Sequence, residues 1–120
     1  MTESRVVLVF EPDLLFSSKI ESEGGRLGAH VSVVTDFDRL VQELTGNLPR
    51  LIVLNLDALE GKLVSLKGVV SGKHCISVGY CSHTNRRLAE EARQSGISVV
   101  MSRGDFVNRI QDILANALSA

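Results

Sequence analysis

The sequence has no strong excess of either charge, because 13 lysines and arginines are balanced by 14 aspartates and glutamates. A net charge of −1 argues against direct nucleic-acid binding and against attraction to anionic membranes. No apolar run approaches the roughly 20 residues of a membrane-spanning helix. The first ten residues, MTESRVVLVF, also lack the pattern of a secretory signal peptide. We therefore expect a cytoplasmic protein without membrane contact.

Cysteine is scarce, and the spacing of the two cysteines excludes the common structural uses of this residue. Cys75 and Cys81 lie on one predicted strand and its exit, where roughly 3.3 Å per residue separates their Cα atoms beyond disulfide reach. There is no C-x-x-C pair and no Cys/His spacing typical of zinc. We expect two reduced thiols and no metal site, with Cys81 as a residue at the edge of the core or, alternatively, as a redox sensor.

The length of 120 residues, with 44% hydrophobic and 22% charged residues, fits one globular domain over residues 1–120. Near-continuous apolar runs, typical of strands covered on both faces, predict five strands. These are Val6–Phe10, Val31–Thr35, Leu51–Leu56, Cys75–Tyr80 and Ile97–Met101.

Segments of helical length alternate with these runs. They are Asp13–Leu27, Phe37–Leu44, Leu59–Val70, Thr84–Ser95 and Asp105–Leu118. Five strand-then-helix units predict an α/β, flavodoxin-like, doubly wound parallel sheet. The expected strand order is 2-1-3-4-5, with helices on both faces of the sheet.

Polar residues follow the predicted strands at their C-terminal ends, where ligands bind in open α/β sheets. The stretch LIVLNLDAL carries Asn55 and Asp57 at the end of the third strand. The tips of the other strands carry Glu11 and Asp13, Cys81 to His83, and Ser102 to Arg103. The sequence therefore predicts that any site gathers these residues at one edge of the sheet.

Four of these stretches resemble the receiver domains of two-component response regulators, and the resemblance covers essentially the whole chain. VLVFEPD is similar to the first strand of that family, whose tip carries an acidic pair that binds magnesium. PRLIVLNL resembles the third strand, which ends in the phosphoacceptor aspartate. ISVGYCSH resembles the fourth, which ends in Thr or Ser, and GISVVMSRGDF resembles the fifth, which ends in Lys-Pro-Phe. The resemblance implies a signalling protein that is not an enzyme.

At the reactive positions the sequence departs from this family. The first position of the acidic pair is Phe10, and only the second keeps a carboxylate, as Glu11. Asn55 occupies the phosphoacceptor position, Cys81 the hydroxyl position and Arg103 the lysine position. A carboxamide is not a nucleophile at neutral pH, and one carboxylate with one amide carbonyl offers too few hard ligands for magnesium. We expect no phosphorylation, no magnesium and no cofactor, and we expect Glu11 to pair with Arg103 in the vacated space.

These departures favour a phosphorylation-independent pseudo-receiver that binds a protein partner. One alternative is a sensor that binds a nucleotide or other anion through His83, Arg86, Arg87 and Arg103, near the N-terminus of the fourth helix. A second alternative is a conventional regulator phosphorylated on Asp57. The simpler interpretation of Asp57 is a loop residue that caps the following helix.

The resemblance places the partner surface, and a homodimer contact, on the fourth helix, fifth strand and fifth helix. Its charged residues would be Arg86, Arg87, Glu90, Glu91 and Arg93. Such mixed charges suit a polar rim that sets specificity more than affinity.

Apolar spots within this rim would be Ala92, Val99 and Leu114, unless these residues belong to the core. The competing surface is the first helix, around Phe16 and Ile20.

Overall fold

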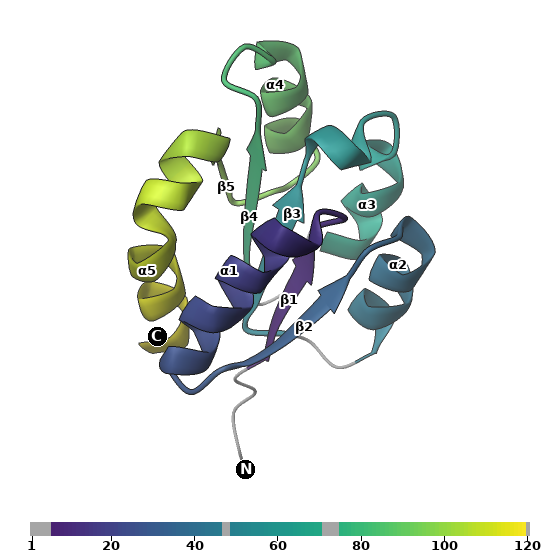
Figure 1. Cartoon of the computed structure of the whole chain (residues 1–120). Coiled ribbons are helices and arrows are strands. Elements are labelled where there is room, and N and C mark those ends of the chain that lie inside the picture. Colours follow the sequence, from purple (N-terminus) through teal and green to yellow (C-terminus); the bar gives the residue numbers. More distant parts are fainter. Residues whose placement is uncertain (1–5, 47–48, 71–74, 120) are drawn as a thin grey trace.

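The computed structural model describes residues 6–46, 49–70 and 75–119. Five strands alternate with five α-helices along the chain (Figure 1). In order they are β1 (Val6–Phe10), α1 (Leu14–Arg26), β2 (His30–Val34), α2 (Phe37–Thr45), β3 (Leu51–Asn55), α3 (Leu63–Val70), β4 (Ile76–Cys81), α4 (Arg86–Gln94), β5 (Val99–Ser102) and α5 (Arg103–Ser119). A short 3₁₀ helix, Asp57–Leu59, lies between β3 and α3.

The strands form one parallel sheet in the order β2-β1-β3-β4-β5, which confirms the predicted fold class. Helices α1 and α5 cover one face, and α2, α3 and α4 cover the other (Figure 1). Every crossover returns the chain to the same end of the sheet, so the carboxyl ends of all strands meet at one edge.

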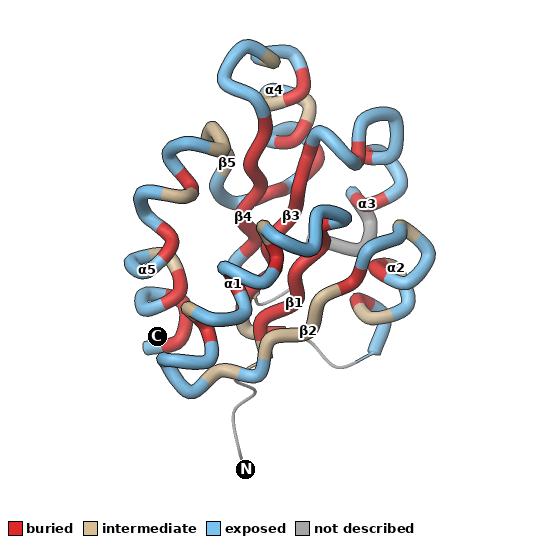
Figure 2. The backbone as a smooth tube through the Cα atoms, viewed as in Figure 1, coloured by how far each residue is buried: buried red, intermediate tan, exposed pale blue. Residues whose placement is uncertain are grey.

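Alternation along the strands divides the apolar side chains into two cores, one on each face of the sheet. Val7, Val9 and Val53 belong to the core under α1 and α5, whereas Leu8 and Phe10 belong to the core under α2, α3 and α4. The buried segments in Figure 2 follow the central strands, as expected for a sheet covered on both sides. At the end of β1, a side chain therefore points to the same core as Val7 or to the same core as Leu8, because successive residues of a strand point to opposite faces.

Several element boundaries differ from the predicted ones. The predicted helix Leu59–Val70 is divided, because the chain turns at Gly61 with a φ of +84°, a conformation that favours glycine. Helix α4 begins only at Arg86, since the Asn85 side chain accepts a hydrogen bond from the backbone of the first turn. Helix α5 begins at Arg103, directly after β5 and two residues before the predicted start.

Both cysteines are free thiols, as predicted. Within the part of the chain that the structure describes, no helix is long and apolar enough to cross a membrane.

Candidate functional site at the carboxyl ends of the strands

Glu11 lies at the centre of the predicted site and is 1% exposed. Its backbone N–H donates to the carbonyl of Val34 at 3.2 Å, which fixes the residue directly after β1. Its carboxylate accepts hydrogen bonds from the Asn55 side-chain amide at 3.0 and 3.1 Å and from the backbone N–H of Asp13 at 2.9 Å. It also accepts one from the Tyr80 hydroxyl. A buried carboxylate needs such donors, and here uncharged groups supply all of these contacts.

Asn55 is the last residue of β3 and is paired in register with Tyr80 on β4. Its side-chain nitrogen donates to Glu11, and its side-chain oxygen accepts from the backbone N–H of Ala58 at 3.2 Å. The amide group is thus engaged at both ends, with its oxygen turned toward the loop that follows β3. Asn55 therefore connects the segment after β1 to the loop after β3, at the carboxyl ends of the strands.

Tyr80 is a residue of this site that the sequence reasoning did not single out. Its ring stacks on Phe106 at 4.6 Å between centroids and meets Phe16 edge-on at 5.3 Å. Burial, and then the hydrogen bond to Glu11, raise the pKa of Tyr80 far above its ordinary value. The hydroxyl therefore stays protonated and donates to the carboxylate. The available signal was strand alternation, because Tyr80 is two residues after Val78 and shares its face.

The side chain of Arg103 lies over the aromatic rings of Phe16 and Tyr80. Its guanidinium carbon lies 4.1 Å from the centroid of the Phe16 ring and 6.0 Å from that of Tyr80. Its ion pair is with Asp13, at 3.8 Å, and its side chain is 42% exposed. The prediction that Glu11 neutralises Arg103 is therefore wrong. The guanidinium lies over the Phe16 ring, while the Glu11 carboxylate is satisfied by Asn55, Tyr80 and the backbone of Asp13.

No family model matches this sequence, and no curated protein matches it. Solved structures do match. A response regulator from Hahella chejuensis has a TM-score of 0.83 at 19% identity, covering 98% of this chain and 97% of the other. One from Thermotoga maritima has a TM-score of 0.79 at 9% identity, covering 98% and 100%. The beryllofluoride-activated NtrC4 receiver domain dimer has a TM-score of 0.78 at 15% identity, covering 96% and 97%. The chain has the receiver-domain fold.

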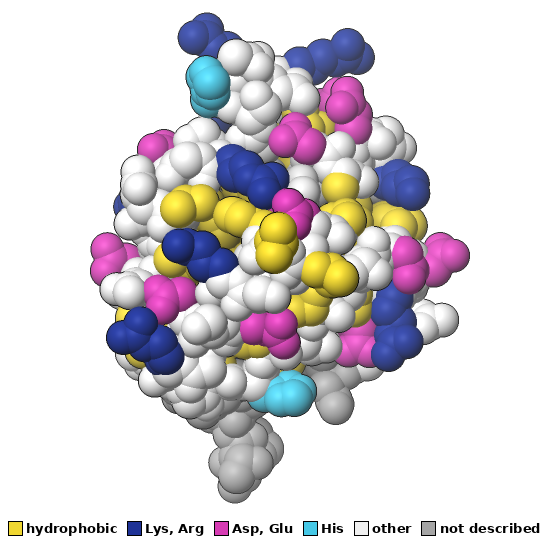
Figure 3. All heavy atoms as spheres, in the orientation of Figure 1, with side chains coloured by type: hydrophobic (Ala, Val, Ile, Leu, Met, Phe, Trp, Pro, Cys, Tyr) yellow, Lys and Arg dark blue, Asp and Glu magenta, His cyan; other side chains and the backbone are white. Residues whose placement is uncertain are grey.

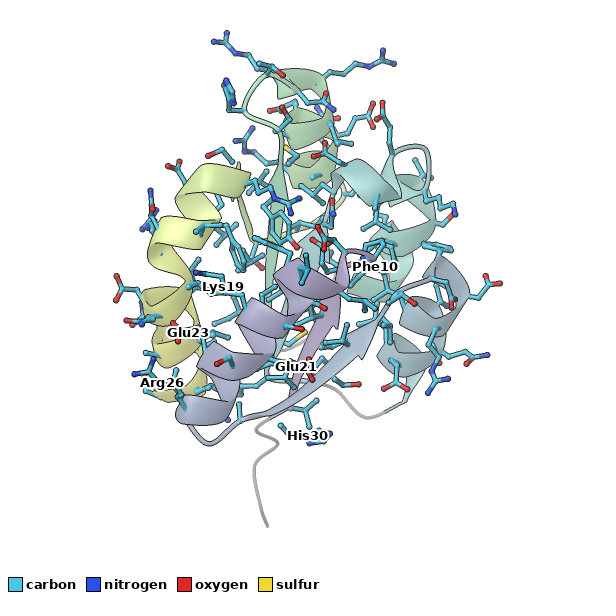
Figure 4. All side chains as sticks on the ribbon, in the orientation of Figure 1. Phe10, Lys19, Glu21, Glu23, Arg26 and His30 are labelled. Atoms are coloured by element: carbon cyan, nitrogen blue, oxygen red, sulfur yellow. The ribbon has the colours of Figure 1, made fainter. Side chains whose placement is uncertain are left out.

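Two of the five positions carried over from receivers point away from this cluster. Phe10 lies on the α2–α3 side of the sheet, where Figure 4 labels it, and packs in that core. Cys81 packs in the same core, with Leu88 and Ala92 of α4. Burial, and then the charge of Asp57, raise the pKa of the Cys81 thiol. In this receiver fold, Tyr80 takes the place at the site that the sequence comparison had given to Cys81.

Asp57 begins the 3₁₀ helix after β3, and its side chain is exposed. Its carboxylate accepts a hydrogen bond from the backbone N–H of Ser82 at 3.0 Å. It therefore links the β3 loop to the β4–α4 loop, and the expectation that it caps the next helix is wrong. Among the described residues, no three His, Cys, Asp or Glu side chains are grouped closely enough to hold a metal ion.

Of the four residues predicted to bind an anion, only His83 and Arg86 line the same groove. His83 and Arg86 line an open groove of about 830 Å³, together with Arg93 and Arg109. Arg103 lies apart from them, over the aromatic rings. Arg87 also lies outside the groove lining and forms an exposed ion pair with Glu91 at 3.5 Å.

Helix α4 carries the predicted charged face, in the form of exposed intrahelical ion pairs. Besides the Arg87 pair, Arg93 contacts Glu90 at 3.3 Å. Of the predicted apolar spots, Ala92 and Leu114 are buried in the cores and Val99 is 42% exposed.

The competing surface on α1 differs from the prediction as well. Ile20 is fully buried, but Leu14 and Leu15 in the first turn are 65% and 88% exposed. Figure 3 shows hydrophobic side chains gathered at the centre of this face, near the N-terminal part of α1. The sequence alone did not separate Leu14 and Leu15 from the buried Ile20, because all three are apolar residues of the same helix.

Proposed function

We propose that this protein is a phosphorylation-independent signalling module with the receiver fold, which presents a constant conformation to a protein partner. The observation that carries this proposal is the hydrogen bonding of Asn55. The residue at the phosphoacceptor position donates to Glu11 instead of presenting a carboxylate to solvent. An amide nitrogen already engaged with a buried carboxylate cannot attack phosphorus.

The arrangement around Glu11 also disfavours magnesium. The ion requires several hard oxygen ligands in near-octahedral geometry. The Asn55 oxygen is committed to Ala58, and the Glu11 oxygens are committed to Asn55, Tyr80 and Asp13. Binding of the ion would have to break these hydrogen bonds.

Incubation with acetyl phosphate and magnesium, followed by intact mass spectrometry, tests the proposal. We expect no gain of a phosphoryl group by the wild-type protein. Asp57→Asn is the matched control, because it removes the exposed carboxylate that follows β3 and leaves Asn55 unchanged. Any uptake by the wild-type protein contradicts the proposal, and loss of that uptake in Asp57→Asn would assign the reaction to Asp57.

The partner surface that we propose is the face of α4, β5 and α5. Its support is the exposure of the charged pairs Arg87–Glu91 and Arg93–Glu90, and the exposed Val99 beside them. The solved NtrC4 receiver domain is a dimer by its description, and a homodimer through this face is the corresponding proposal for this chain. Reversing both charges at Arg87 and Glu91 should change partner binding or self-association in a salt-dependent manner.

A substitution on α1 provides the contrast. Leu15→Glu adds a charge to an exposed apolar residue of α1, on the other side of the sheet from α4, so it should leave association through α4 intact. Association lost in Leu15→Glu and retained in the α4 variant would place the partner on α1.

A further inference from the structure

Strand β5 is an edge strand whose residues are exposed or half-buried. It pairs with β4 alone, in the register Val78↔Val99 to Cys81↔Ser102. Among the hydrogen bonds of the described residues outside regular helices and strands, none involves the backbone of residues 99–102. An edge strand of this kind presents unpaired N–H and C=O groups, which can pair with another extended segment.

A groove runs along this edge. All four residues of β5 line it, although Val100 packs toward the core under α4 and Met101 toward the core under α5. Side chains from both faces of a strand can line one groove only when the groove follows the edge of that strand. Figure 1 shows β5 at the margin of the sheet, with α5 on one side and α4 at its upper end.

The two walls of the groove carry arginines in excess of carboxylates. Arg86 and Arg93 come from α4 and Arg109 from α5, against Glu90 and Asp105. Glu90 is engaged by Arg93 at 3.3 Å. The side chains of Arg86 and Arg109 form no ion pair or hydrogen bond with the described residues, and both residues are exposed. Each wall therefore carries one arginine without an acidic partner in the described part of the chain, and the groove is also lined by the apolar Ala89 of α4 and Val99 and Val100 of β5.

We propose that this groove binds an extended, acidic segment of a partner protein, which adds to β5 as a further strand. Main-chain hydrogen bonds to the β5 edge would supply the register. Small apolar residues would lie on the floor of the groove, and carboxylates would meet Arg86 and Arg109. The inference rests on the proposed role as a partner-binding module and adds the conformation and charge of the partner.

The probe is a terminally blocked octapeptide with two glutamates at each end and the centre Val-Thr-Val-Thr. Its titration is followed by NMR of the backbone amides, in buffer without magnesium or phosphodonor. We expect saturable shifts and slowed hydrogen exchange at residues 99–102. The matched peptide, N-methylated at all four central nitrogens, keeps the charge but has no central N–H left to pair along either edge, and it should not bind.

Two protein variants test the charge requirement. The double variant Arg86→Glu, Arg109→Glu should weaken binding about ten-fold, since two exposed charge contacts are lost and reversed. The double variant Arg26→Glu, Arg39→Glu makes the same change in net charge on α1 and α2 and should bind as the wild type does.

Four results would overturn the inference. They are equal binding of the N-methylated peptide, shifts that map outside the groove, no saturable shifts, and self-association that protects residues 99–102 without peptide. Failure of the proposed function would show separately, as phosphoryl uptake in the mass measurement, while the peptide titration does not depend on that result.

Discussion

Restoring a carboxylate at position 55 should destabilise the protein in the absence of metal. In Asn55→Asp the side chain loses the nitrogen that donates to Glu11 at 3.0 and 3.1 Å, and it places a second carboxylate against the first. Loss of a hydrogen bond to a charged group costs about 1.5–3 kcal/mol. Repulsion between the two carboxylates adds to this cost, and uptake of one shared proton limits it. We expect the free energy of unfolding to fall by about 2–4 kcal/mol near neutral pH.

Urea unfolding followed by circular dichroism measures this change. Stability should recover partly as the pH is lowered from about 8 to about 5, because the folded pair can then bind a proton that the unfolded chain does not yet bind. Millimolar magnesium should also stabilise Asn55→Asp more than the wild type, since the variant offers two adjacent carboxylates. Asn108→Asp, an exposed position on α5, is the matched control and should change stability by no more than about 0.5 kcal/mol.

A variant as stable as the wild type, without magnesium and across this pH range, would refute the reasoning. Such a result would mean that the Asn55 amide contributes little to holding Glu11 in the folded protein. The hydrogen bonds at the site would then not explain a fixed conformation.

Three further substitutions test other contacts of the fold. Tyr80→Phe removes one donor from the buried carboxylate and should lower the free energy of unfolding by about 1–3 kcal/mol, measured by the same urea titration. Arg103→Ala should cost less than about 1 kcal/mol in a thermal melt, because its side chain is 42% exposed and its ion pair is long at 3.8 Å. Gly79→Ala would place a Cβ 2.8 Å from the Leu56 side chain and should cost about 1–3 kcal/mol, whereas the matched Gly104→Ala meets open space and should be nearly neutral.

The sequence by itself determined the architecture. Five short apolar runs separated by segments of helical length allow few arrangements besides a parallel sheet with crossover helices. That topology brings the residues after β1 and β3 to the same edge, so the meeting of Glu11 and Asn55 followed from the order of elements. The order of strands and helices is predicted correctly even when their predicted boundaries are slightly wrong.

Only the tertiary structure decided which neighbouring side chains enter the site. Tyr80 and Cys81 are consecutive in a strand and face opposite cores, so strand alternation assigns the hydroxyl only once the face that Val78 occupies is known. Arg103 is long enough to reach several acidic groups. Packing of the Phe16 and Tyr80 rings decided that its guanidinium lies above them, beside Asp13 and apart from Glu11. Such choices depend on three-dimensional contacts between residues far apart in the chain, which no local pattern encodes.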